Sequence, residues 1–213
     1  MKKTSLKRPI DYGMEKLNGL MSDMINLSEK ALEKSIEAVL SRVDAIKDVR
    51  KMSDELLFMM DEVSELAVQL IARYQPVASD LREIKSAIQV SYDLSRIGRY
   101  AANISEVVTM IPESGCDFTQ FKELSQIVLE MVRDIGKAYL NKDLTKAEEV
   151  KKRDDKVDEL YAEYIKNLIE MNGRIDRACL LSIALAIRYL ERIADHTCYI
   201  ADAVSYILTG RKQ

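Results

Sequence analysis

Apolar residues recur every three or four positions along almost the whole chain, which is the spacing of one face of an α-helix. Leu20, Met24, Leu27 and Ala31 are one example. Only 7 of the 213 residues are glycine and 3 are proline, so few positions can interrupt a helix. The sequence therefore predicts an all-α fold of long helices with short connections.

The breaks in this pattern divide the chain into two halves. Residues 111–117 contain both Pro112 and Gly115 and no apolar periodicity, which is typical of a linker. We therefore expect a first three-helix repeat over 1–110 and a second over 118–213. In the first repeat, the expected helices cover about 11–49, the segment from Ser53 or Asp54 to the Gln75-Pro76 break, and 77–110. In the second repeat, they cover 118–140, 144–171, and the segment from the Asn172-Gly173 turn to Leu208. Gly210 is the expected stop of the last helix.

The two halves match at a constant offset. The apolar stripe of the third helix reappears in the last helix 96 positions later, as from Leu94 to Leu190, and Arg96 matches Arg192 at the same offset. Matching stripes, turns and linker indicate an internal duplication. The sequence predicts two tandem three-helix bundles related by a pseudo-twofold axis.

Common enzyme motifs are missing from the sequence. It contains neither G-x-x-x-x-G-K-[ST] nor G-x-G-x-x-G, the loops that cradle phosphates. His196 is the sole histidine, and no Ser or Cys nucleophile lies in a recognisable order around it. The net charge of −3 argues against a nucleic-acid partner. We expect a protein that is not an enzyme and does not bind nucleic acid.

No segment has the length of a membrane-spanning helix. The uncharged stretch 178–187 is well short of the roughly 20 residues required. We expect no signal peptide, because the basic N-terminus leads into Pro9 and Asp11. The basic N-terminal residues (Lys2, Lys3, Lys7 and Arg8) indicate a disordered tail or, alternatively, a segment that contacts a membrane surface or a partner.

The three cysteines, Cys116, Cys179 and Cys198, are odd in number and form no C-x-x-C motif. This pattern is typical of reduced cysteines in a cytosolic protein, and it predicts neither a disulfide nor a thiolate metal site.

Four carboxylates form the most distinctive polar pattern. Glu191 and Asp195 are four positions apart on the last predicted helix and share a face, and Asp154 and Asp158 do the same on the preceding helix. If these helices pack antiparallel, the four side chains converge, and oxygen ligands of this kind suit hard or borderline cations. His196 is a candidate for an additional nitrogen ligand.

Acidic pairs at this spacing are also frequent on solvated helix faces, and 35 acidic residues make such pairs common here. Glu191 and Asp195 differ from the others because they flank the apolar stripe of Leu190 and Ile193, where a charge needs a partner. Both interpretations, a metal site and a solvated face, stay open from spacing alone.

Several segments carry a resemblance to a known family. In the first half, residues 75–84 (QPVASDLREI) and 93–98 (DLSRIG) are similar to the pattern QPVA-x-DLR-x-I … DLERIGD. In the second half, residues 190–196 (LERIADH) and 201–210 (ADAVSYILTG) are similar to LERIGDH … AE-x-V-x-Y-x-x-TG, and residues 154–161 (DDKVDELY) resemble the matching part of the preceding helix. These patterns are those of the PhoU family, and the resemblance covers nearly the whole chain.

The resemblance implies a function as well as a six-helix fold. Family members are regulators that act between a phosphate-specific ABC transporter and a sensor histidine kinase, and they damp uptake and signalling when phosphate is ample. It implies contacts with the transporter ATPase and the kinase, a homodimer, a cytoplasmic location and at most a peripheral association with the membrane.

The resemblance also implies a multinuclear metal cluster, of iron or zinc, on E(D)-x-x-x-D motifs. Glu191 and Asp195 match one such motif, and Asp154 and Asp158 match its partner. At the offset of 96, the first half has Ser95, Arg99, Phe58 and Glu62 at the corresponding positions. We therefore expect metal in the second repeat only, or a protein that works without metal.

Three alternatives remain beside this interpretation. The chain could be a helical accessory protein of another phosphate or ion carrier, or a helical scaffold without metal. It could also be a carboxylate-bridged metalloprotein, although di-iron chemistry commonly uses Glu-x-x-His on two helices. Here the sole histidine follows Glu191 by five positions.

Overall fold

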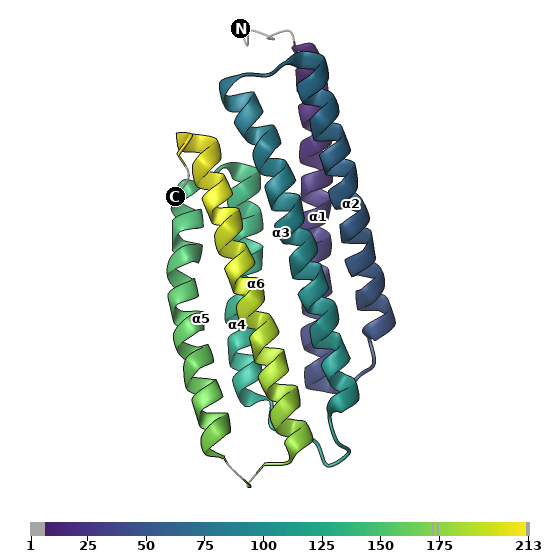
Figure 1. Cartoon of the computed structure of the whole chain (residues 1–213), viewed down its shortest axis with the longest axis vertical. Coiled ribbons are helices and arrows are strands. Elements are labelled where there is room, and N and C mark those ends of the chain that lie inside the picture. Colours follow the sequence, from purple (N-terminus) through teal and green to yellow (C-terminus); the bar gives the residue numbers. More distant parts are fainter. Residues whose placement is uncertain (1–6, 172, 174, 212–213) are drawn as a thin grey trace, which may run out of the picture.

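The described part of the chain forms six long helices, as the sequence predicts. The computed structural model describes residues 7–171, 173 and 175–211, and within these ranges it contains no strand. Figure 1 shows the helices lying side by side, with the first three in one half and the last three in the other. The helices are α1 (Pro9–Ser41), α2 (Ile46–Tyr74), α3 (Ala78–Glu106), α4 (Thr119–Asn141), α5 (Leu144–Glu170) and α6 (Arg177–Thr209), and a 3-10 turn (Val107–Met110) follows α3.

Local sequence signals explain most of the helix ends. Asp143 caps α5 by accepting a hydrogen bond from the Lys146 N–H, and Asp176 caps α6 by accepting from the N–H groups of Ala178 and Cys179. Gly210 ends α6 in the left-handed conformation, with φ of 73°, which confirms the predicted stop.

The boundary between α1 and α2 lies earlier than predicted. The sequence pattern extends one helix to about Val49, but α1 ends at Ser41 and α2 begins at Ile46. Arg42 adopts the left-handed conformation, with φ of 55°, and the Asp44 side chain accepts a hydrogen bond from the Ile46 N–H. Neither glycine nor proline marks this turn, and the apolar spacing continues through it, so the pattern gave no sign of the break.

The two halves share a continuous hydrophobic core. Within each half the three helices pack against one another, and the halves meet where α3 contacts α6 and where α1 contacts α4. Gly136 allows the α1–α4 contact, because a Cβ at this position would lie 2.5 Å from Cγ2 of Ile25. Consequently α3 and α6 run together through the centre of the molecule (Figure 1).

The expectation of three reduced cysteines is wrong for two of them. Cys116, in the linker, forms a disulfide with Cys179, in the first turn of α6, and only Cys198 is a free thiol. The two bonded residues are 63 positions apart, and their Cα atoms lie 5.4 Å from each other because the linker passes the start of α6. This proximity comes from the tertiary fold, and cysteine spacing alone does not reveal it.

The basic N-terminus is described only from Lys7 onward. Lys2 and Lys3 lie outside the described residues, so the tail hypothesis is untested there. Arg8 forms ion pairs with Asp11 and with Asp80 of α3, and it thereby connects the start of α1 to the start of α3. Among the described residues, no helix combines the length and the apolar character needed to cross a bilayer.

Candidate functional site

The four carboxylates of the second repeat lie on neighbouring helices, as the spacing predicts. Glu191 and Asp195 are on α6, and Asp154 and Asp158 are on the adjacent α5. Glu191 is only 7% exposed and Asp154 is half-buried, whereas Asp158 is exposed. We call these four residues the acidic seam.

Arginine side chains neutralise the α6 part of the acidic seam. Arg192 donates two hydrogen bonds to Glu191, at 3.0 and 3.1 Å, and lies 3.1 Å from Asp195. Arg188 donates a further hydrogen bond to Glu191 at 2.9 Å. Burial raises the pKa of Glu191, and the nearby Asp195 charge raises it further, whereas the two arginines act in the opposite direction.

Asp154 is the member of the acidic seam with an unpaired carboxylate oxygen among the described residues. Its Oδ1 atom is buried and has no hydrogen-bond partner among the described residues. Burial raises the pKa of Asp154, and the charges of Asp158 and Asp195 contribute in the same direction. Burial and the nearby Asp154 likewise raise the pKa of the Cys198 thiol, which makes this free cysteine a poor nucleophile.

The seam in this arrangement does not fit a metal ion. Within the ranges 7–171 and 175–211, no group of three His, Cys, Asp or Glu side chains is placed to hold one. Arg192 occupies the oxygens of both Glu191 and Asp195, the residues expected to supply ligands. Metal binding in the second repeat therefore stays a prediction, and it requires Arg192 to release these carboxylates.

His196 points away from the acidic seam. Its Nδ1 atom lies 2.9 Å from Oδ1 of Asp93, a fully buried residue of α3, and the pair connects the two repeats. Tyr100 and Tyr199 surround the imidazole, with ring centroids 5.7 and 5.4 Å away. Asp93 was not predicted as a site residue, although an acid within the apolar stripe beside Leu94 indicates a buried charge that needs a partner.

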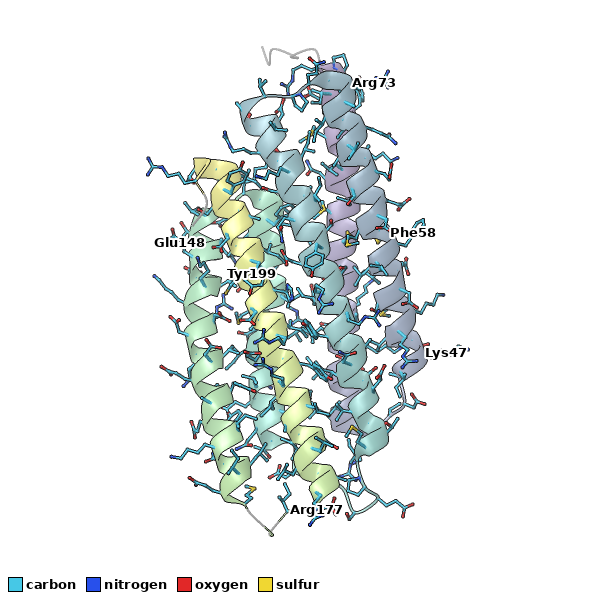
Figure 2. The ribbon with its side chains drawn as sticks, in the orientation of Figure 1. Lys47, Phe58, Arg73, Glu148, Arg177 and Tyr199 are labelled. Atoms are coloured by element: carbon cyan, nitrogen blue, oxygen red, sulfur yellow. A yellow bond between two sulfur atoms is a disulfide. The ribbon has the colours of Figure 1, made fainter. Side chains whose placement is uncertain are left out.

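Of the four corresponding positions that the sequence predicts in the first repeat, only Glu62 carries an acidic group. Ser95 is 7% exposed and occupies the place of Glu191, and Arg99 is exposed and occupies the place of Asp195. Phe58 is 63% exposed, and Figure 2 shows it pointing away from the bundle on the outer side of α2. Glu62 is exposed as well.

The pattern of buried residues shows that equivalent positions of α2 and α5 are separated by a different number of residues than those of α3 and α6. The buried positions of α2 recur in α5 94 positions later, as from Ser53 to Ala147 and from Val63 to Val157. At this offset the counterpart of Asp154 is Met60, not Phe58. A single offset fails because α3 begins four positions after the end of α2, whereas α6 begins seven positions after the end of α5.

These features define a class of protein: a duplicated six-helix bundle whose two repeats meet through their last helices and carry charged motifs along that line. A family model for the PhoU domain matches residues 21–108 and again 121–204. The chain belongs to the PhoU family.

Relatives and solved structures agree with this assignment. The phosphate-specific transport system accessory protein PhoU homolog 1 of Thermotoga maritima is 32% identical over 90% of this chain and 85% of its own length. The homolog of Clostridium acetobutylicum is 30% identical over 97% of both chains. The crystal structure of PhoU from Pseudomonas aeruginosa superimposes with a TM-score of 0.90 at 29% identity, covering 94% of this chain and 99% of that one.

Proposed function

We propose that this protein is a regulator of phosphate uptake and of phosphate-responsive signalling, and that it acts through contacts with other proteins. The observation that carries the proposal is the match of both repeats to the PhoU domain, together with relatives named as accessory proteins of the phosphate-specific transport system. The proposed partners are the ATPase of a phosphate ABC transporter and a sensor histidine kinase, at the cytoplasmic side of the membrane. The proposed working form is a homodimer.

The outer surface of α2 supports a role in protein contacts. Phe58, Val68 and Leu57 are 63%, 59% and 46% exposed on this helix. Burying exposed apolar side chains of this size against a partner is favourable, because removal of apolar surface from water contributes about 25 cal/mol per Å². The first repeat therefore offers a helix face for a partner beside the charged sites described above.

The test is phosphate uptake in cells that lack the gene, grown with ample phosphate. Loss of the protein should raise uptake and the output of the phosphate-responsive kinase, and the intact gene should restore both. The replacement Phe58→Ser with Val68→Ser should fail to restore them and should lose co-purification with the transporter ATPase. Ile169→Ser, at a 71% exposed apolar position of α5, is the matched control.

Normal uptake in the deleted strain would refute the proposed function. Full restoration by the α2 double variant would leave regulation in place but would exclude this helix face as the contact surface. The homodimer is tested separately, by light scattering of the purified protein.

A further inference from the structure

A small pocket opens between α2 and α3 at the first-repeat counterpart of the acidic seam. It has a volume of about 140 Å³, which is room for a few water-sized groups and therefore for one phosphate group. We call it the arginine pocket. It is lined by Ser53, Leu57, Met60, Tyr92, Ser95, Arg96 and Arg99.

The lining of the arginine pocket is positive. It contains two guanidinium groups and no carboxylate. Arg96 donates a hydrogen bond to the Tyr100 hydroxyl at 2.9 Å and has no acidic partner within the described part of the chain. Arg99 is exposed and forms no ion pair or hydrogen bond with any described residue. Both cations are therefore available to an anion.

A buried hydroxyl in the pocket also lacks a partner. Ser53 is only 5% exposed, and its side chain makes no hydrogen bond to a residue that the structure describes. The hydroxyl lines the pocket and can therefore donate a hydrogen bond to an occupant. Ser95 instead donates to the Tyr92 carbonyl, at 2.7 Å.

Comparison with the second repeat shows that the charge of this place is inverted. Ser95 and Arg99 of α3 correspond to Glu191 and Asp195 of α6, and Met60 of α2 corresponds to Asp154 of α5. Three carboxylates in one repeat are thus a hydroxyl, a guanidinium and a thioether in the other. Carboxylates therefore cluster at this position in the second repeat, whereas the equivalent position in the first repeat attracts an anion.

We propose that the arginine pocket binds a phosphate group. Guanidinium groups match the oxygens of phosphate in planar, paired hydrogen bonds, and Arg99 and Arg96 supply such donors on one helix face. The Ser53 hydroxyl donates a further hydrogen bond from the pocket wall. The phosphate group comes either from free orthophosphate or from a phosphate monoester, since the chemistry of recognition is shared.

This inference deepens the proposed function, because its meaning in the cell rests on phosphate regulation. Binding itself is measured on the purified chain without any partner. Normal uptake in the deleted strain, together with phosphate binding by the purified chain, would refute the proposed function alone. Raised uptake in the deleted strain, together with absence of binding, would refute the arginine pocket alone.

The experiment is calorimetric titration of the full chain at low ionic strength with orthophosphate and, separately, with glycerol phosphate. We expect a dissociation constant of about 1 mM or tighter for at least one of them, weakening as salt is added. Tighter binding of orthophosphate assigns the free ion, and tighter binding of glycerol phosphate assigns an ester. Absence of binding of both at 10-fold higher concentration, about 10 mM, would overturn the proposal.

Three variants locate the site. Arg99→Gln should weaken binding roughly tenfold or more, because it removes a charge-assisted contact, and Ser95→Glu with Arg99→Asp, which restores the acidic residues of the second repeat, should abolish it. Arg177→Gln is the matched control, since Arg177 is also exposed and has no partner among the described residues. Arg99 is at the surface, so its variant should fold, and a thermal melt verifies this. Equal weakening by Arg99→Gln and Arg177→Gln would overturn the proposal.

Discussion

His196 and Asp93 form a buried pair across the two repeats, with Nδ1 and Oδ1 2.9 Å apart. The two residues are 103 positions apart in the sequence and belong to α6 and α3, the helices through which the repeats meet. Asp93 is fully buried, and its other carboxylate oxygen accepts a hydrogen bond from Gln89 at 3.2 Å. The pair therefore fixes the register of the two central helices with a directional contact, in addition to the apolar packing around it.

Replacing His196 with Phe should destabilise the protein. The change leaves the Asp93 carboxylate buried with Gln89 as its remaining partner, and an uncompensated buried charge costs about 3 kcal/mol. The melting temperature at pH 7, followed by circular dichroism, should fall by roughly 6–12 °C. Asp93→Asn added to His196→Phe should recover part of this loss. A single variant that melts within about 2 °C of the original would contradict the prediction.

Replacing Asp154 with Asn should stabilise the protein at neutral pH. The pKa of Asp154 is raised in the folded state above its ordinary value of 3.8, so folding favours the protonated form. The unfolded chain then releases its proton at lower pH than the folded chain does, and stability falls as the pH rises from 3.8 through the folded-state pKa. Asp154→Asn removes this loss, which we put at about 1 kcal/mol because the residue is half-exposed.

The gain from Asp154→Asn should vanish below pH 3.8, where the carboxyl is protonated in both states. The measurement is urea unfolding at several pH values with a chelator present. Asp155→Asn, at the exposed neighbouring position, is the control and should change little. A destabilised Asp154→Asn protein at pH 7 would show that the charge of Asp154 is needed by a contact absent from this structure.

The fold was predictable because its signals are local. Apolar spacing, the linker with Pro112 and Gly115, and the Gly210 stop each depend on a few neighbouring residues, and all three led to the observed helices. The turn at Arg42 was missed because a left-handed arginine has no characteristic sequence signal. The different separations of equivalent positions in the two repeats were also missed. They depend on how far each connection shifts the buried face of the helix that follows it, and no local sequence signal reports this shift.

The candidate site was only partly predictable. Helix periodicity placed Glu191 and Asp195 on one face and brought Asp154 near them, because neighbouring helices in a bundle share a seam. Which cation neutralises these carboxylates depends on side-chain conformation, and no sequence pattern favours Arg192 over a metal. The partners Asp93 and Cys179 lie far along the chain from His196 and Cys116, so only the tertiary structure identifies them.

Reduction of the Cys116–Cys179 disulfide should destabilise the protein. The bond closes a loop across 63 positions, and a cross-link of that length restricts the unfolded chain by an amount worth about 2–4 kcal/mol. Dithiothreitol should lower the melting temperature of the oxidised protein to that of the Cys116→Ser variant, and should leave that variant unchanged. Cys198→Ser, at the free thiol, should keep the sensitivity to reduction. Three alkylated thiols in the non-reduced, air-oxidised protein would contradict the bond.

Metal retention should depend on Arg192. This side chain pairs with both Glu191 and Asp195, so a metal ion has to compete with it for the same oxygens. After reconstitution with iron or zinc, metal per chain measured by mass spectrometry should be higher for Arg192→Gln than for the unmodified protein. Glu191→Ala combined with Asp195→Ala should abolish retention, whereas Ser95→Ala in the first repeat should not alter it. Metal that persists in the double alanine variant would place the ion outside the acidic seam, and Arg192 would then serve only to neutralise buried carboxylates.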